Sequence, residues 1–216
     1  MYQARLRTAT ALRMLMLTLA AMVCLTGCRP AALLYYLLLA PEPKIAAEFD
    51  KLKDKKVVVH VYATAAARYA YANIEADLRR YVVRELLENV EDIQIADPDE
   101  VVRWCMENEG FSLEELGKQF DADYVVYVEL QRFAISDPAS PQLYRGKAAA
   151  TIQVADVHQG GDIVWETYVE SLYPASRSVP ASEISGPKFR QVYVRRLARE
   201  IARHFFPYRP EEKFTL

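Results

Sequence analysis

The stretch Ser112–Leu130, with the sequence SLEELGKQFDADYVVYVEL, decides the fold because it passes directly from a helix to a strand. Its first four residues predict a helix start, since the Ser112 hydroxyl can accept from a backbone N–H while Glu115 reaches back to the cap. From Tyr124 onward apolar residues alternate, and this period of two is typical of a strand with one buried face. A helix and a strand so close together indicate helices packed on a sheet.

The upstream segments extend the same mixture of elements. Val57–Tyr62 is a β-branched run typical of a buried strand, and a small-residue loop is predicted at Ala63–Ala67. Apolar residues recur at helical spacing over Ile74–Leu86, which predicts an amphipathic helix. A short strand is expected at Ile93–Ala96, and Asp97 is expected to cap the helix that follows.

The downstream segments predict two more strands and a long helix. Ala148–Val154 and Ile163–Val169 alternate, and the tight Gly-Gly link between them predicts an antiparallel hairpin. The Pro-marked stretch Asp137–Pro141 is expected to be a longer loop. Pro187 opens the last helix. The expected buried stripe of that helix is Val194, Leu197, Ala198, Ile201 and Phe205.

The order of these elements predicts the fold class α/β (α+β), with a single mixed β-sheet of about five strands and helices packed on it. The domain is expected to span residues 55–208, with a C-terminal tail at 209–216. The 216-residue chain is 52% hydrophobic and holds 7 Gly and 3 Cys, which excludes disorder, collagen and a disulfide scaffold. A formal net charge of −2 offers no overall attraction for a polyanion, so no nucleic-acid partner is expected.

Residues 1–27 have the parts of a secretory signal peptide. Three arginines precede an apolar run, Met14–Leu25, that is too short to span a bilayer. Leu25-Thr26-Gly27-Cys28 then resembles the lipobox of bacterial lipoproteins. The resemblance implies that the Cys28 thiol receives a diacylglycerol, that the chain is cut before it, and that its new amine is acylated, for example with palmitate. The alternative is an uncleaved anchor over residues 14–40, which Arg29-Pro30 would interrupt.

Residues 28–54 form the expected lipidated N-terminus, with an apolar membrane-proximal segment at Ala31–Ala40 and a charged lead-in. In lipoproteins an Asp after the cysteine is associated with inner-membrane retention, and here that position is Arg29. We therefore expect a cell-envelope protein anchored to the outer membrane and facing the periplasm. The apolar segment would lie either in the bilayer interface or against the domain or an oligomer partner. Its candidate contact residues are Leu33, Leu34, Tyr35 and Tyr36.

Cleavage before Cys28 would change the charge balance and the cysteine count. It would remove three arginines and leave 24 basic against 29 acidic residues. Cys24 would leave with the signal peptide and Cys28 would carry lipid, so Cys105 would have no disulfide partner within the chain. Its neighbours Trp104 and Met106 favour a core thiol over a reactive one.

The last predicted helix concentrates positive charge. Between Lys188 and Arg203, six bases oppose a single acid, Glu200. Arg195, Arg199 and Arg203 recur every four residues, so they share one face of the helix. Lipid headgroups, an acidic partner, or acidic residues of the same domain would each suit that face.

The chemistry-bearing residues do not form a catalytic pattern. His60, His158 and His204 have no second His, Cys or acid at metal-ligand spacing, and the chain has no glycine-rich phosphate loop or nucleophile elbow. We therefore expect no metal, no cofactor and no enzymatic activity. An enzyme would instead need a polar pocket that gathers residues such as His60 and Asp123.

Three segments carry a resemblance to known families: Leu116–Val126, Tyr144–Ala148, and Val154–Val157 together with Gly160–Trp165. They resemble the fold shared by the amino-terminal domain of the Tol-system translocation protein, the curli-secretion lipoprotein and the lipoprotein activator of penicillin-binding proteins. The resemblance implies a TolB N-terminal-like fold. Among proteins with this fold, the chain looks most similar to envelope lipoproteins of planctomycete-type bacteria.

These features predict a non-catalytic, lipid-anchored envelope protein that acts as an interaction, assembly or regulatory factor. Its expected partners are membrane lipid, through acylated Cys28, and an envelope protein. One alternative is an oligomeric subunit of a secretion or pore complex, in which the chain would bind further copies of itself. A second alternative is an auxiliary lipoprotein of an envelope transport system.

Overall fold

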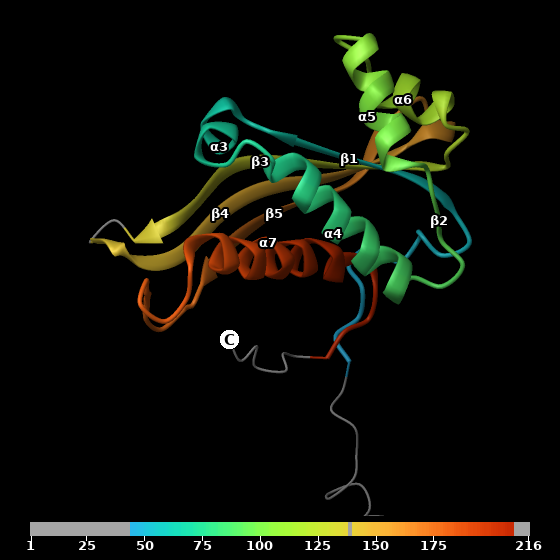
Figure 1. Ribbon diagram of the computed structural model, residues 1–216. Helices are drawn as coiled ribbons and strands as arrows, with labels where there is room; N and C mark the ends of the chain where they lie inside the picture. Colours follow the sequence, from blue (N-terminus) through green and yellow to red (C-terminus); the bar gives the residue numbers. More distant parts are fainter. Residues whose placement is uncertain (1–43, 138–139, 210–216) are drawn as a thin grey trace, which may run out of the picture. The chain divides into compact units, whose positions relative to one another are not determined.

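One mixed β-sheet organises the part of the chain that the computed structural model describes, residues 44–137 and 140–209 (Figure 1). Its strands are β1 (Lys56–Ala63), β2 (Gln94–Ile95), β3 (Tyr124–Asp137), β4 (Ser140–Asp156), β5 (Asp162–Tyr173) and β6 (Val179–Pro180). They lie in the order β2-β1-β3-β4-β5, with β6 also paired to β4. β1 is parallel to β2 and β3, whereas β3, β4 and β5 are antiparallel neighbours. The predicted α+β class with a mixed sheet is confirmed.

The helices begin close to the predicted caps. They are α3 (Ala65–Ala70), α4 (Ile74–Asn89), α5 (Pro98–Glu107), α6 (Leu113–Gln119) and α7 (Gly186–Ala202), with single 3-10 turns η1 (Val157–Gln159) and η2 (Arg203–Phe205). The Asp97 carboxylate accepts from the N–H groups of Asp99 and Glu100, at 2.8 and 3.2 Å. Ser112 and Glu115 form the complete capping box. Both caps are local interactions, which is why the sequence pattern locates them. None of the helices in the described residues is long and apolar enough to cross a membrane.

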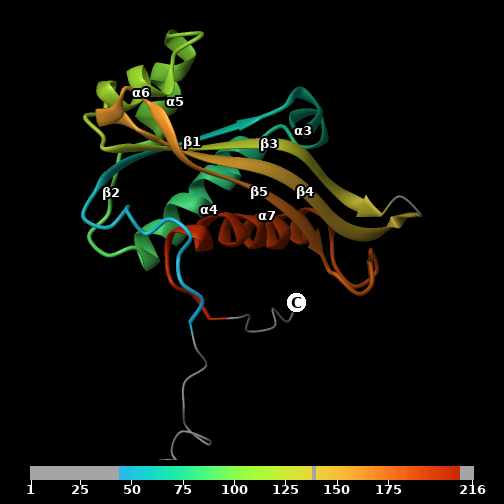
Figure 2. The same ribbon diagram turned by 180° about the vertical axis from the view of Figure 1, so that it is seen from behind.

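The two faces of the sheet are covered unequally. The long helices α4 and α7 lie together on one side, where they bury the main core, including Leu78, Leu130 and Leu197 (Figure 1, Figure 2). α5 and α6 cover the other side near one end and bury a smaller cluster that includes Val58 and Val125 (Figure 1, Figure 2). The whole expected stripe of the last helix is buried.

The segment Ser112–Leu130 is held in place by close packing of the Gly117 backbone against the Val157 side chain. A Cβ on Gly117 would lie 2.2 Å from Cγ2 of Val157, so only glycine lets α6 sit against η1. Asp121 ends the helix in the left-handed region, with φ 49°. The Asp123 carboxylate then accepts from the Lys56 N–H at 2.9 Å and joins the start of β3 to β1.

Three local predictions are wrong. Asp137–Pro141 is not a longer loop, because β3 runs to Asp137, β4 starts at Ser140, and these two residues pair with each other. Ala63–Ala67 is not a loop, since Ala63 ends β1 and α3 starts after Thr64. The alternation over Ile163–Val169 predicts that Ile163 faces inward with Trp165, Thr167 and Val169, but it does not, because a bulge pairs Val154 with Trp165 and Ala155 with Ile163. The bulge turns Ile163 to the other face, where it is 44% exposed.

The segment before β1 packs into the same unit as the sheet. Phe49 and Leu52 are buried in the main core. Ile45 forms a two-way antiparallel bridge with Tyr208, with N–O distances of 2.7 and 3.0 Å. The first and last described segments therefore lie side by side.

Candidate interaction surfaces

The site residues predicted near the amino terminus lie outside the described residues. They are Cys28, Leu33, Leu34, Tyr35 and Tyr36. The predicted basic residues Arg195, Arg199 and Arg203 lie on α7 and the η2 turn that follows it. Each of these three arginines has a different intramolecular neighbour.

Arg199 is paired within the domain. Its Nε and Nη2 lie 3.2 and 3.4 Å from the two carboxylate oxygens of Glu85 on α4. The Glu85 side chain is 4% exposed and that of Arg199 is 47% exposed. A buried carboxylate needs such a counter-charge, so Arg199 serves the packing of α4 against α7.

Arg195 belongs to an arginine cluster around one tyrosine. The guanidinium carbons of Arg80, Arg84 and Arg195 lie 5.2, 4.9 and 5.6 Å from the ring centre of Tyr81. Tyr81 is only 5% exposed, so its ring is packed between α4 and α7, and the three arginines lie around it. Sequence analysis missed Arg80 and Arg84, although helical spacing places both on the polar side of α4. The spacing of residues within α4 shows which of them are polar and outward, but it does not show that these residues lie next to α7.

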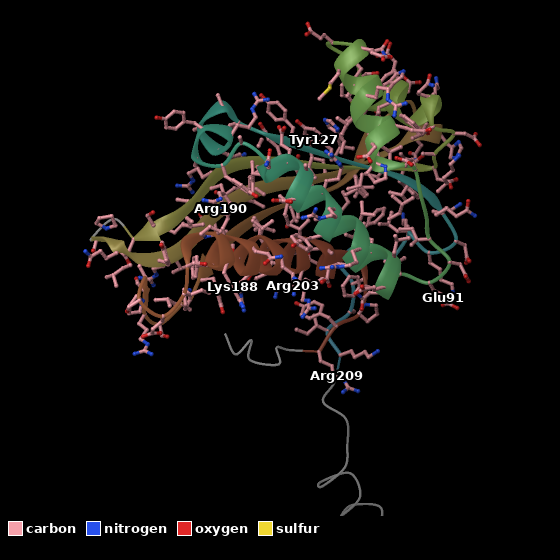
Figure 3. The ribbon with its side chains drawn as sticks, viewed as in Figure 1. Glu91, Tyr127, Lys188, Arg190, Arg203 and Arg209 are labelled. Atoms are coloured by element: carbon pink, nitrogen blue, oxygen red, sulfur yellow. The ribbon has the colours of Figure 1, made fainter. Side chains whose placement is uncertain are left out.

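Arg203 lies at the far end of α7. Its guanidinium carbon is 5.2 Å from the ring centre of Tyr208. Figure 3 shows Lys188 and Arg203 toward the two ends of α7, and Arg209 further along the chain. We call the outer side of α4 and α7 the basic face. Helical spacing places Lys188, Arg195, Arg199 and Arg203 on it from α7, and Arg80 and Arg84 join it from α4 beside Tyr81.

A second surface is the part of the sheet that α5 and α6 leave uncovered. Register places Tyr62, Glu129, Thr151 and Tyr168 in one row across β1, β3, β4 and β5. Tyr62 is 38% exposed and Tyr168 is 51% exposed. Tyrosines that present a ring and a hydroxyl to solvent are typical of protein interfaces.

The outer edge of β5 adjoins this surface. β5 is the last strand in the sheet order, and within the described residues no other strand pairs with its outer edge. Large apolar side chains are exposed along it, namely Ile163, Val164, Tyr168 and Leu172. A twelve-residue edge with unpaired backbone groups can accept another strand.

His60 and Cys105 lie next to each other behind α5, and both are uncharged near pH 7. Sγ of Cys105 lies 3.7 Å from Nδ1 of His60, whose ring stacks on Tyr127. Burial, followed by the nearby positive charge of Arg79, lowers the pKa of His60 to about 4. Burial raises the pKa of the Cys105 thiol to about 11, against the opposing effect of Arg79. A neutral imidazole beside an un-ionised thiol is a poor nucleophile pair.

The structure does not bring His60 and Asp123 into one site. Asp123 contacts Nε2 of His158 at 3.1 Å and Nζ of Lys55 at 3.5 Å, at the start of β3. His204, the third histidine, pairs with Glu48 at 2.9 Å. Over residues 44–137 and 140–209, no group of three or more His, Cys, Asp or Glu residues is placed to hold a metal ion.

No protein-family model matches the chain, and no curated protein matches it. Similar solved structures include the PelC dodecamer from Paraburkholderia phytofirmans, with 14% identity and a TM-score of 0.45, covering 77% of this chain and 98% of that one. Lipoprotein GNA1162 from Neisseria meningitidis has 13% identity and a TM-score of 0.43, covering 68% and 97%. The LpoB C-terminal domain from Salmonella enterica has 14% identity and a TM-score of 0.38, covering 57% and 87%. The resemblance to the Tol-system and curli families stays a prediction.

Proposed function

We propose that this chain is a non-catalytic lipoprotein of the cell envelope, held by lipid on Cys28 at the outer membrane and facing the periplasm. Its domain binds an envelope protein and acts as an assembly or regulatory factor. The observation that carries the binding role is the outer edge of β5, with which no strand of the described residues pairs, and which exposes large apolar side chains beside a tyrosine-bearing sheet surface. An extended segment of the partner would add to this edge as a further strand.

The charges along β5 favour a foreign strand over a second copy of β5. Glu166 and Glu170 flank Tyr168 on the same side of the strand; Glu170 pairs with Arg132 at 3.1 Å, and Glu166 accepts from the neutral Gln153 amide and keeps its charge. If two β5 edges paired antiparallel about Tyr168, Glu166 of each copy would lie opposite Glu170 of the other. Like charges directly opposite destabilise a strand pair, whereas basic residues at those positions would stabilise it. We therefore expect the partner segment to carry Lys or Arg.

Site-specific crosslinking tests this proposal with the full chain in native envelopes. A photo-crosslinking amino acid replaces Tyr168, and in a matched control it replaces Tyr69, a tyrosine on α3 that is 96% exposed. We expect a discrete adduct with another envelope protein from position 168 and none from position 69. The exposed-edge variant Tyr168→Lys/Leu172→Lys should lose co-purification of that protein.

Other outcomes separate the alternatives. An adduct of twice the chain mass would favour the oligomeric subunit, and an adduct with a transport component would favour the auxiliary lipoprotein. Absence of any adduct from position 168 would reject the edge as a binding site. The anchor is tested separately, because Cys28→Ala should abolish labelling by fatty acid and release the protein from membranes.

A further inference from the structure

The basic face keeps an excess of cations after its neighbouring acids are counted. Four carboxylates adjoin it, and each is paired: Asp77 with Arg80 at 2.6 Å, Glu85 with Arg199 at 3.2 Å, Glu88 with Arg84 at 3.9 Å, and Glu200 with Arg196 at 2.9 Å. Among the residues that the structure describes, Lys188, Arg195 and Arg203 have no carboxylate at ion-pair distance. Their three positive charges are therefore not neutralised within the domain.

The composition of the basic face differs from that of a protein-binding patch. Arg80 and Arg84 are exposed on α4, and Lys188 and Arg195 are exposed on α7. Leu87, which shares the outer side of α4, is the one large apolar side chain exposed on these two described helices. Protein interfaces gather aromatic and apolar side chains at their centre, and the basic face has no such centre.

The chain enters the described domain at one end of the basic face. Lys44, the first described residue, lines a hollow of about 480 Å³ together with Arg199, Arg203 and Arg209. Figure 3 shows Arg203 and Arg209 in this part of the molecule. Cys28 precedes Lys44 by sixteen positions, which a fully extended chain would cover in at most about 55 Å. A lipid on Cys28 would therefore keep the basic face close to its bilayer, at a high effective concentration.

We infer that the basic face lies against the headgroups of an anionic bilayer, with α4 and α7 toward the lipid. The inference rests on the proposed lipid anchor at Cys28. Basic side chains near an anionic membrane gain from its negative surface potential, and guanidinium groups bind phosphate oxygens. Leu87 would enter the interfacial region, where apolar side chains are favoured.

The extent of the face favours lipid over an acidic protein. Its cations run from Lys188 in the first turn of α7 to Arg203 beyond the last turn, roughly 20 Å along the helix. A bilayer offers phosphate groups over that whole distance. The tyrosine-bearing sheet surface lies on the other side of the sheet from α4 and α7, so this orientation leaves it open to a partner (Figure 2).

The test compares how closely two positions of the full acylated chain approach lipid in reconstituted vesicles. A fluorescent amino acid replaces Gln191, which is exposed on α7 between Lys188 and Arg195. In a matched control it replaces Met106, which is exposed on α5 across the sheet. The vesicles contain phosphatidylcholine with a spin-labelled headgroup that quenches nearby fluorophores, either without phosphatidylglycerol or with about one-third of it.

The orientation predicts a difference between the two positions that depends on lipid charge. In anionic vesicles we expect at least twofold stronger quenching at position 191 than at position 106. In neutral vesicles the two positions should be quenched equally. About 0.5 M NaCl should remove the difference, because salt screens interactions between exposed charges.

Charge-reversal variants test which residues set the orientation. Lys188→Glu and Arg195→Glu should each reduce the quenching at position 191, and the double variant should reduce it to the level in neutral vesicles. Arg103→Glu, at an exposed position on α5, should leave it unchanged. An acid in the first turn of a helix is favourable, so Lys188→Glu should keep the wild-type unfolding midpoint even if Arg195→Glu loses its contact with Tyr81.

The outcomes separate the basic face from the anchor. Protein bound to both kinds of vesicle, with equal quenching at positions 191 and 106, would overturn the inference and leave the anchor intact. Binding to anionic vesicles alone, with stronger quenching at position 191, would support the inference and contradict the anchor. Binding to neither would contradict both. Unchanged quenching in the folded double variant, or crosslinking of position 191 to an acidic protein without lipid quenching, would also overturn the inference.

Discussion

Arg199 on α7 holds the buried carboxylate of Glu85 on α4 through two hydrogen bonds, at 3.2 and 3.4 Å. Without the guanidinium, the Glu85 carboxylate, whose side chain is only 4% exposed, would be left without this counter-ion. We expect Arg199→Ala to lower the free energy of unfolding by about 1–2 kcal/mol, less than for a fully buried pair because solvent reaches the arginine. Urea unfolding measures the loss. The double variant Glu85→Gln/Arg199→Ala should recover most of it, and wild-type stability in Arg199→Ala would contradict the pairing.

Gly117 should not tolerate a side chain. A methyl group there would enter the space of Val157, with the added Cβ 2.2 Å from Cγ2. We expect Gly117→Ala to cost roughly 1–3 kcal/mol by overpacking, measured as a lower thermal midpoint. Shortening the opposing side chain in Gly117→Ala/Val157→Ala should restore part of the midpoint. If the double variant is no more stable than Gly117→Ala, the contact with Val157 is not the cause.

Acid should destabilise the domain through His60. Its folded-state pKa of about 4 lies below the unfolded value of 6.5, so the folded chain resists protonation. The contribution of neutral His60 to the free energy of unfolding is fully present above pH 6.5 and is lost as the pH falls toward 4. The loss amounts to about 3 kcal/mol at most, at 1.36 kcal/mol per pKa unit. His60→Phe should flatten the dependence of unfolding free energy on pH over this range. An unchanged slope in that variant would exclude His60 as the titrating group.

Cys105 should be slow to alkylate in the folded protein. Burial raises the pKa of the Cys105 thiol to about 11. At pH 8 the folded protein therefore holds roughly a hundredfold less thiolate than a thiol with the ordinary pKa of 9.0 would. Iodoacetamide labelling, followed by mass spectrometry, should therefore accelerate strongly when urea unfolds the chain. Labelling at equal rates in the folded and unfolded states would show that the thiol is not held in an apolar setting.

The elements that the sequence predicts well are those set by local interactions. Asp97 and the Ser112–Glu115 pair cap helices within one turn, and the alternation in β3 follows from which side chains meet the core. The errors arise where a distant partner decides. Whether Asp137 ends a strand depends on Ser140 in β4, and the bulge that reorients Ile163 depends on the register with Ala155.

The surfaces were harder to predict than the fold. The spacing of Arg195, Arg199 and Arg203 places them on one helix face, but not whether acids of the same domain neutralise them. Glu85 is 114 residues away from Arg199, and it occupies a buried site that only the packing of α4 on α7 creates. The sequence also does not show that β5 lies at the edge of the sheet, because strand order is a property of the assembled sheet.

The bridge between Ile45 and Tyr208 determines where mechanical load enters the domain. Any tension transmitted along the chain from residues before Lys44 reaches this two-bond bridge before it reaches β1. Behind the bridge, the N–H groups of Glu48 and Phe49 donate to the carbonyl of His204, at 2.9 and 3.0 Å. A pull on the chain at Ile45 would therefore separate residues 45–49 from the end of the last helix, and the sheet would bear no load until those contacts had opened.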